Sequence, residues 1–522
     1  MSPFALLLAM ILTTPATVDA PDTLVICPRA FQPTMQRWVA YRETQGHKVI
    51  VRAPADNSYS IREQVKAIAK QGKLKNVVIV GDAISSAQQQ HLTVPTDYVP
   101  AKVNVLFGSE PEISSDNSYA DIDNDGIVDL TIGRIPVDSV GQLNLFIDRV
   151  IKYEANEDCG RWQRKVNFIA GVGGFGMLVD RLIQQSATQI ITDLIPDAYD
   201  TSMTYGSWQS PYCPDPRRFS ETTINRFNEG CMFWVYIGHG NRHRLDRVML
   251  PDGRYNILDV NSAEQMNAKE GSPIAIFLAC YTGAFDDPKD CLAETLVCKK
   301  DGPIAAICST RVSMPYAMGL MSLEMMDGYF DNKAETIGEL ILMAKRKMVK
   351  GTKDPDKYRK LIESMGKAFN PKPNLLGAER KEHVHLMHLL GDPLMRLQRP
   401  EKIELKVAEK TKPGEKIKVT GKSPIAGTIE LDLSYRRDRF RIRPKRRKEY
   451  DSADAVFASY QKTYEQTHDL VCIKQTIKVD KGSFATELEI PSDASGDCVV
   501  RAILITKKEM ALGSAKIYIV DE

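Results

Sequence analysis

A succession of short, continuous apolar runs between residues 22 and 400 constrains the fold of this chain more than any other feature. Examples are residues 232–237, 274–279 and 304–308, none of which alternates regularly between apolar and polar residues. Strands that are apolar on both faces are typical of parallel sheets covered by helices on both sides. Between such runs, residues 61–71 carry apolar side chains at helical spacing. The sequence therefore predicts an α/β fold with a mostly parallel sheet flanked by helices.

The pattern of apolar and polar residues changes near residue 400. Five segments beyond this point alternate apolar and polar residues between turns, at 402–419, 426–435, 470–479, 483–490 and 498–505. This alternation is typical of a β-sandwich. With 522 residues the chain is also too long for one hydrophobic core. We predict four parts, namely a signal peptide (1–20), an N-terminal α/β subdomain (21–155), a second α/β subdomain (156–400) and an all-β sandwich domain (401–522).

The N-terminus indicates export. Residues 4–12 form an apolar run that is too short to span a bilayer as a helix, and Val18 and Ala20 offer small side chains to a signal peptidase. We expect cleavage near Ala20 and a periplasmic, cell-surface or secreted protein. A buried N-terminal strand or helix is the alternative. No later stretch is long and apolar enough to predict a transmembrane span.

Charge and cysteine spacing exclude several classes of function. The formal net charge is +2, from 69 basic and 67 acidic residues, which gives no electrostatic argument for nucleic acid or membrane as the main partner. Nine arginines and lysines cluster within residues 435–450, a pattern that usually marks a solvated loop. None of the ten cysteines forms a CxxC pair, so a zinc ribbon is not expected. Cys472 and Cys498 are the first disulfide pair to consider, because both fall in the β-rich part.

Two strand ends carry the residues with the clearest chemistry. One apolar run ends in Gly238-His239-Gly240, and a later run ends in Ala279-Cys280. Taken singly, such a histidine is an ordinary loop residue and such a cysteine a small buried one. In a parallel sheet, however, the carboxyl ends of both strands open on one edge, where ligands bind. An imidazole beside a thiol suits nucleophilic catalysis, because the thiolate attacks while histidine carries its proton.

Five further sequence segments resemble those of a known protein family. The segments 74–82, 119–126, 129–136, 307–310 and 389–393 occur in the same order as in the gingipain family of caspase-clan cysteine peptidases. The chain resembles that family over roughly residues 22–400. The resemblance implies a caspase-like sheet followed by an immunoglobulin-like domain. It also implies an endopeptidase acting on proteins or peptides, with His239 as base, Cys280 as nucleophile, and the amides of Gly240 and Cys280 holding the oxyanion.

One position departs from the family. An acidic residue after the strand that precedes the histidine helps to orient the imidazole in the family, and Gly173 stands there in this chain. Asp180, in the next helix, could replace this residue or could select basic side chains in the substrate. An ordinary aspartate interacting with a helix N-terminus is an equal alternative.

The stretch from Asp121 to Asp129 resembles a calcium loop. Asp121, Asp123, Asp125 and Asp129 supply oxygen ligands at nearby positions, and Gly126 permits a tight turn. The full EF-hand pattern is absent, because Ile132 occupies the position of the bidentate glutamate. We favour a structural Ca²⁺ ion over a plain polar turn, because the related enzymes bind calcium. No organic cofactor is expected.

Three other functions stay open at this point. A transpeptidase or sorting enzyme of the same family would pass the acyl group to an amine instead of water, and a binding protein would keep only the fold. A dinucleotide-dependent oxidoreductase would use the glycine-rich residues 171–176. These glycines are better explained as a turn at the active-site edge. His383, His385 and His388 are interpreted as surface or hydrogen-bonded histidines rather than metal ligands.

Overall fold

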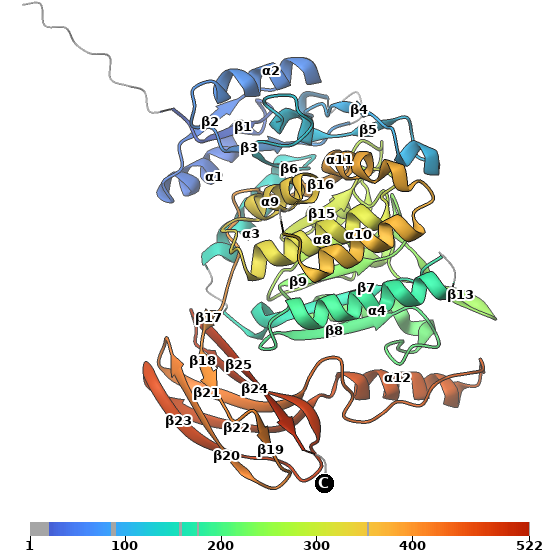
Figure 1. Cartoon of the computed structure of the whole chain (residues 1–522). Helices are drawn as coiled ribbons and strands as arrows, with labels where there is room; N and C mark the ends of the chain where they lie inside the picture. The colour runs from blue at the N-terminus through green and yellow to red at the C-terminus, as the bar shows by residue number, and fades with distance from the viewer. Residues whose placement is uncertain (1–19, 85–89, 156–158, 175–176, 352–353, 521–522) are drawn as a thin grey trace, which may run out of the picture.

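The computed structural model describes residues 20–84, 90–155, 159–174, 177–351 and 354–520. Residues 1–19, which carry most of the expected signal peptide, lie outside the described residues. A ten-stranded sheet runs through the α/β part (Figure 1), in the order β2-β1-β3-β6-β16-β15-β14-β9-β7-β8. Its strands are β1 (Thr23–Ile26), β2 (Val49–Arg52), β3 (Asn76–Val80), β6 (Thr131–Ile135), β7 (Lys165–Ala170), β8 (Asp200–Tyr205), β9 (Phe233–Ile237), β14 (Ile274–Leu278), β15 (Ala305–Ser309) and β16 (Met387–Leu390).

The sheet is parallel except at one junction. β16 pairs antiparallel with β15 but parallel with β6, so the two halves of the sheet run in opposite directions. On the far side of this junction, β15, β14, β9, β7 and β8 are all parallel to one another. The carboxyl ends of these five strands therefore share one edge of the sheet, and both expected catalytic residues follow strands of this group.

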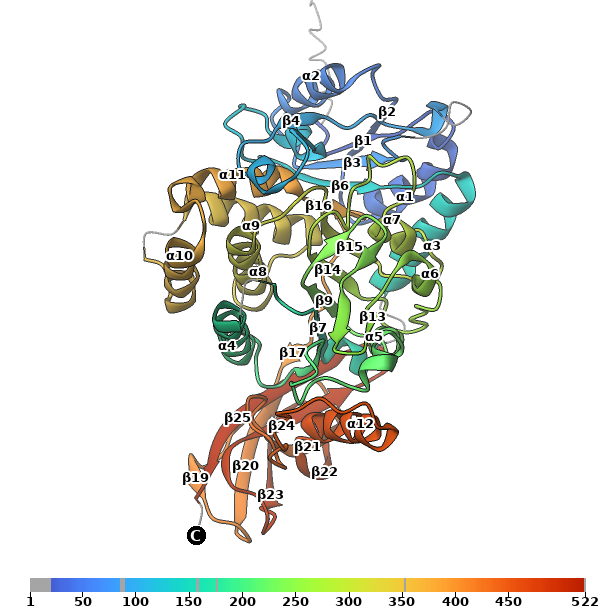
Figure 2. The ribbon, with the colours of Figure 1, turned by 90° about the vertical axis from the view of Figure 1, so that its right-hand side faces the viewer.

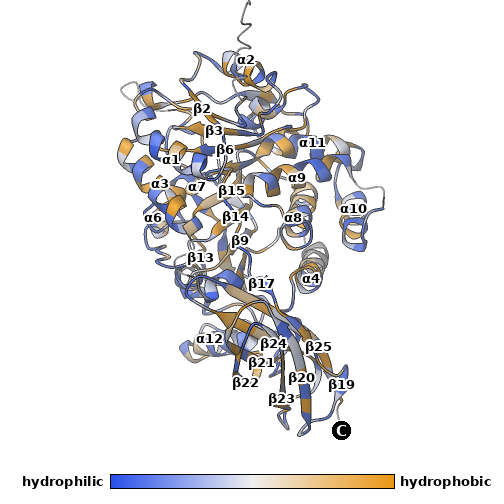
Figure 3. Cartoon of the chain, turned by 90° about the vertical axis from the view of Figure 1, so that its left-hand side faces the viewer, coloured by the Kyte–Doolittle hydropathy of each residue, from blue (hydrophilic) through white to orange (hydrophobic). Residues whose placement is uncertain are grey.

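Helices cover both faces of the sheet (Figure 2). One face carries α1 (Gln32–Thr44), α3 (Val140–Ala155), α5 (Phe219–Asn228), α6 (Val260–Ala263) and α7 (Leu292–Val297). The other carries α4 (Met177–Leu194), α8 (Pro315–Phe330), α9 (Ile337–Lys350), α10 (Lys357–Phe369) and α11 (Leu376–Leu386), while α2 (Ser58–Ala69) packs at the N-terminal end. Hydrophobic residues line the central strands (Figure 3), and β14 and β15 are buried throughout. The α/β prediction with a mostly parallel sheet is confirmed.

Two packed sheets follow in the C-terminal part. One joins β17 (Glu401–Lys402), β19 (Lys410–Thr411), β21 (Gly427–Tyr435), β22 (Val471–Val479), β24 (Gly496–Ile505) and β25 (Met510–Ile519). The other joins β18 (Glu404–Lys406), β20 (Lys416–Ser423) and β23 (Gly482–Glu489). Val419, from the smaller sheet, and Leu431, from the larger one, lie in one buried cluster. The predicted β-rich C-terminal part is therefore confirmed.

A helix missing from the sequence prediction connects the two parts of the molecule. α12 (Asp454–His468) is inserted between β21 and β22 and lies beside the α/β part (Figure 1). The Tyr464 hydroxyl hydrogen-bonds Thr204, and His468 accepts a hydrogen bond from the Met203 amide. The basic segment that precedes α12 is only partly a solvated loop, because the side chain of Arg437 is buried and donates to the Pro196 and Tyr199 carbonyls.

Two further expectations concern cysteines and membranes. Cys472 and Cys498 lie on β22 and β24, the two neighbours of β21, and no disulfide joins them. Among the helices within the described ranges, none is both long and apolar enough to cross a membrane.

Candidate active site

The sheet brings the loops that carry His239 and Cys280 into contact. β9 and β14 are neighbouring parallel strands whose last paired residues are Ile237 and Leu278. His239 and Cys280 each follow two residues later, at the same edge of the sheet. A methyl group in place of the Gly240 hydrogen would lie 2.7 Å from the carbonyl oxygen of Cys280. The two strand ends therefore meet as the sequence predicts.

The thiol of Cys280 is half-buried and engaged by the next strand end. The Ser313 amide donates a hydrogen bond to Sγ of Cys280 over 3.3 Å, and the Ser313 carbonyl lies 3.7 Å from the same sulfur. Burial raises the pKa of the Cys280 thiol above its ordinary value, although the Ser313 amide opposes this shift. The thiol is therefore protonated at neutral pH, and attack on a carbonyl requires a base that removes the proton.

Tyr236 fixes the backbone of His239. The hydroxyl of this fully buried side chain donates to the His239 carbonyl over 2.8 Å and accepts from the Asp246 amide over 3.3 Å. Gly238 has φ = +157°, and a methyl group there would lie 2.7 Å from the same hydroxyl oxygen. The Gly-His-Gly sequence thus lets the chain turn directly over a tyrosine that holds it.

The glycine-rich loop after β7 lies against the imidazole. A methyl group at Gly174 would approach Nε2 of His239 to 3.2 Å, so this loop borders the candidate base. Gly173 belongs to the same loop and has no carboxylate to offer. Asp180 belongs to α4, and its side chain lies outside the described residues. Neither role considered for Asp180 is tested by these contacts.

Two residues that border the candidate site were not identified from the sequence, namely Asp246 and Ser313. Asp246 follows β11 (Arg244–Leu245), and its Oδ2 would lie 3.4 Å from a methyl group at Gly171, within the glycine-rich loop. Ser313 approaches the sulfur from the loop after β15. The sequence could have indicated Ser313, because the 304–308 run is a third strand whose carboxyl end opens on the same edge of the sheet. No comparable pattern distinguished Asp246 from other loop aspartates.

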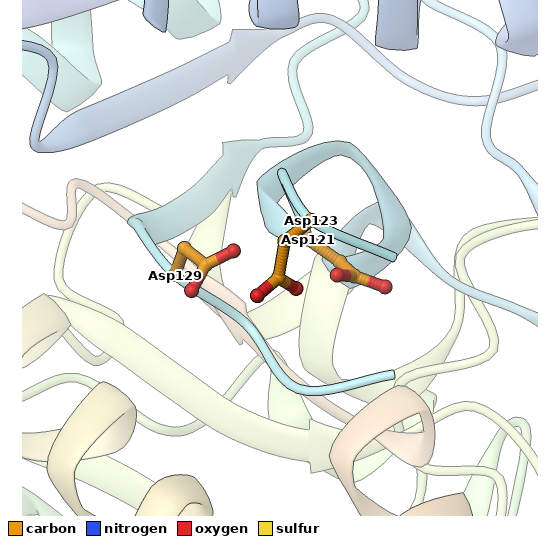
Figure 4. Close-up of side chains that lie close together, drawn as sticks. All are labelled: Asp121, Asp123 and Asp129. Carbon is orange, nitrogen blue, oxygen red and sulfur yellow. The ribbon is translucent and has the colours of Figure 1, made fainter. Parts of the chain in front are cut away.

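The acidic loop between η3 (Asp116–Ala120) and β6 gathers three of the four predicted ligands. One carboxylate oxygen from each of Asp121, Asp123 and Asp129 lies within 4.8 Å of the others (Figure 4). Asp125 is not in this group, and its carboxylate accepts the Ile127 amide over 2.8 Å. Oδ1 of Asp121 is buried without a hydrogen-bond partner within the described ranges, and burial raises the pKa of this carboxyl. A cation would satisfy both features.

The histidines of α11 and β16 are structural. His383 accepts the Met314 amide over 2.9 Å, and His388 accepts the Asp116 amide over 3.1 Å. Both are buried, so the expectation of hydrogen-bonded histidines is confirmed for them, whereas a surface position is wrong. In both rings Nε2 accepts a backbone amide, and Nδ1 donates to a backbone carbonyl, that of Glu379 for His383 and that of Leu386 for His388. Both nitrogens of each ring are therefore used in hydrogen bonds rather than turned toward a shared metal.

Comparison with known proteins supports the same family. The model of peptidase family C25 matches residues 16–398. Gingipain R2 of Porphyromonas gingivalis is 26% identical over 303 residues, which is 55% of this chain and 36% of that protein. The chain thus spans about a third of the length of this curated relative.

Solved structures of low sequence identity support the fold. The crystal structure of the Arg-specific cysteine proteinase gingipain R has a TM-score of 0.54 and 18% identity, with 95% of this chain and 98% of that chain covered. A complex of the pro- and mature domains of Porphyromonas gingivalis RgpB gives a TM-score of 0.52 and 20% identity, with coverage of 95% and 99%.

Proposed function

The chain belongs to peptidase family C25, a family of cysteine-type peptidases, and from this premise we propose that it is an exported endopeptidase with Cys280 as nucleophile and His239 as general base. The observation that carries the proposal is the shared sheet edge. His239 and Cys280 follow adjacent parallel strands in equal register, and their loops are in contact. Hydrolysis of casein or of fluorogenic peptides by the purified protein, in reductant and calcium, tests it.

The proposed reaction has two stages. His239 takes the thiol proton, and Cys280 Sγ attacks the scissile carbonyl carbon to form a tetrahedral oxyanion. Collapse breaks the C–N bond, and the amine leaves with the proton from His239. Water, deprotonated by His239, then hydrolyses the thioester and regenerates the thiol. The amides of Gly240 and Cys280 are the proposed oxyanion donors, each worth about 3 kcal/mol of barrier.

Substrate preference is part of the proposal. One structural relative carries the description Arg-specific, and Asp180 stands in a helix that begins beside the glycine-rich loop. We therefore expect a basic residue before the cleaved bond. A panel of peptides varied at that residue will show highest kcat/KM for arginine or lysine. Equal rates across the panel would remove Asp180 from this role.

Export is supported by the N-terminal sequence pattern and by the family. Expression of the full chain in a secreting bacterial host is expected to give a mature N-terminus near Ala20. N-terminal sequencing of the exported protein measures this. An intact Met1 on the protein would argue against the signal peptide.

A structural calcium ion is the second part of the proposal. Asp121, Asp123 and Asp129 would bind it, and the unpartnered Oδ1 of Asp121 supports a hard cation there. Ca²⁺ at about 100 times its Kd is expected to stabilise the fold by about 3 kcal/mol. Thermal unfolding measured with calcium and with EDTA will show this shift in wild type and lose it in Asp121→Asn.

Asp125→Asn is the matched control for calcium binding, because Asp125 lies in the same loop but outside the three-carboxylate group. It is expected to retain most of the thermal shift. If Asp121→Asn keeps the full shift, or wild type shows none, the loop is a polar turn and not a calcium site.

A further inference from the structure

The carboxylate of Glu110 is contacted by three segments of the candidate site. These segments carry His239, Cys280 and Ser313. Glu110 lies between η2 (Asn104–Phe107) and β5 (Glu112–Ser114), in the N-terminal half of the chain. It accepts a hydrogen bond from the Tyr281 hydroxyl over 2.7 Å and one from Arg242 over 2.6 Å. Nε of Arg311 lies 3.6 Å away. Each of these three partners lies within three residues in sequence of Cys280, His239 or Ser313.

Tyr281 is the residue directly after the nucleophile. Its φ of +58° lies in the left-handed region, which is uncommon for a residue with a side chain. A backbone conformation of this kind persists only where surrounding contacts hold it. Two such contacts are present, because the Tyr281 amide donates to the Arg311 carbonyl over 3.2 Å and its hydroxyl is bound by Glu110.

Arg242 and Arg311 connect Glu110 to the other two segments. Arg242 follows His239 by three residues, and its guanidinium carbon lies 4.7 Å from the centre of the Tyr281 ring. Arg311 precedes Ser313, whose amide contacts the Cys280 sulfur. One carboxylate thus contacts the His239, Cys280 and Ser313 segments together.

The charges around Glu110 favour its ionised form. Arg242 also pairs with Asp287 over 2.9 Å, and Arg311 pairs with Asp286 over 2.6 Å. Burial alone would raise the pKa of Glu110, but the Tyr281 and Arg242 hydrogen bonds and the Arg311 charge hold it below its ordinary value. The two arginines therefore face a permanent negative charge at neutral pH. Arg311 is only 6% exposed at its side chain and keeps Asp286 as its closer partner, so loss of Glu110 acts mainly through the Tyr281 and Arg242 hydrogen bonds.

We propose that Glu110 is a positioning residue, which aligns the segments after His239 and Cys280 for the peptidase reaction. The inference rests on the proposed function and deepens it. Glu110 acts through Arg242, Tyr281 and Arg311. The site is accordingly completed by the N-terminal half of the chain, since Glu110 and Arg242 are 132 residues apart in sequence.

The test compares Glu110→Ala, Glu110→Gln and wild type in covalent labelling by acyloxymethyl-ketone peptides. A set of probes ending in arginine, lysine, leucine or aspartate is tried first on wild type, and the best is used. Two quantities are measured, namely the labelling rate and the final fraction labelled. Misplacement of reacting groups by about 1 Å costs up to about 100-fold in rate. We expect a loss of about 10- to 100-fold for Glu110→Ala with an unchanged final fraction.

Glu110→Gln tests the role of the charge. Its amide oxygen can still accept the Tyr281 hydroxyl, but it offers no charge to the arginines, so an intermediate rate is expected. Glu112→Gln is the matched control, because this exposed side chain lies two residues away and only its backbone carbonyl contacts Arg311. It should label at the wild-type rate. Combining Glu110→Ala with Tyr281→Phe should cost less than the product of the single losses, because both changes remove the hydrogen bond between Tyr281 and Glu110.

The outcomes separate this inference from the proposed function. Wild type that none of the probes labels would refute the peptidase assignment, and the positioning role would fall with it. Labelled wild type with Glu110→Ala at an equal rate would overturn the inference alone. A normal rate with a smaller labelled fraction would also overturn it, because it indicates that Glu110 only stabilises the fold.

Discussion

Cys280→Ala will abolish covalent labelling by the best acyloxymethyl-ketone peptide, while wild type is labelled to completion. The probe forms a thioether with the attacking sulfur, and alanine at this position has no sulfur to offer. His239→Ala will be labelled about 10²- to 10⁴-fold more slowly, the range typical of a lost general base. The raised pKa of the half-buried Cys280 thiol is the reason for this dependence, since little thiolate forms without a base. Mass spectrometry of the intact protein measures both effects.

Cys472→Ala is the matched control for the nucleophile. Cys472 is also half-buried but lies on β22 of the C-terminal part, far from the sheet edge that carries Cys280. Its loss should leave labelling unchanged. Labelling that persists in Cys280→Ala would place the nucleophile elsewhere. A His239→Ala variant with the wild-type rate would show that another group accepts the thiol proton.

The parallel sheet and the dyad could be predicted because both depend on local patterns. A continuous apolar run needs no distant partner to identify it as a buried strand, and β9 and β14 match the predicted runs within one residue at each end. Once two such strands are parallel, their carboxyl ends share an edge. His239 and Cys280 could thus be identified from the sequence without any knowledge of side-chain contacts.

The reversed strand and the inserted helix could not be predicted in this way. β16 has four buried residues, and nothing in Met387–Leu390 specifies that it runs antiparallel to β15. α12 is stabilised by aromatic residues such as Phe457 and Tyr464, which pack on the α/β part. Its helical state depends on that tertiary surface and on the neighbouring basic segment.

The remaining site residues depend on contacts between segments distant in sequence. Glu110 and Tyr281 meet across 171 residues, and Ser313 reaches the Cys280 sulfur across 33. A single glutamate in a loop carries no pattern that indicates three partners. The acidic loop shows the same limit on a smaller scale, because Asp125 fits the alternating spacing but lies outside the group of three carboxylates.

Gly240→Ala is expected to lower kcat/KM for peptide hydrolysis by about 10²- to 10³-fold, the cost of losing one oxyanion donor. The added methyl group would lie 2.7 Å from the Cys280 carbonyl oxygen and 2.9 Å from Cβ of Ala279. Both distances are below van der Waals contact, so the loop must move away from the nucleophile. That movement takes the Gly240 amide, the proposed oxyanion donor, out of position. Peptide hydrolysis and probe labelling should fall together.

Gly253→Ala serves as the control for the backbone change. A methyl group at Gly253, in β13 (Gly253–Asn256), meets the Tyr255 ring at 3.4 Å, an ordinary contact, and full activity is expected. Circular dichroism and thermal unfolding will show whether Gly240→Ala remains folded, and the final labelled fraction will give the share of competent molecules. A folded Gly240→Ala protein with wild-type kcat/KM would show that the oxyanion is bound by other donors. A reduced fraction with normal turnover would mean that the glycine serves folding alone, because the molecules that fold would then catalyse without it.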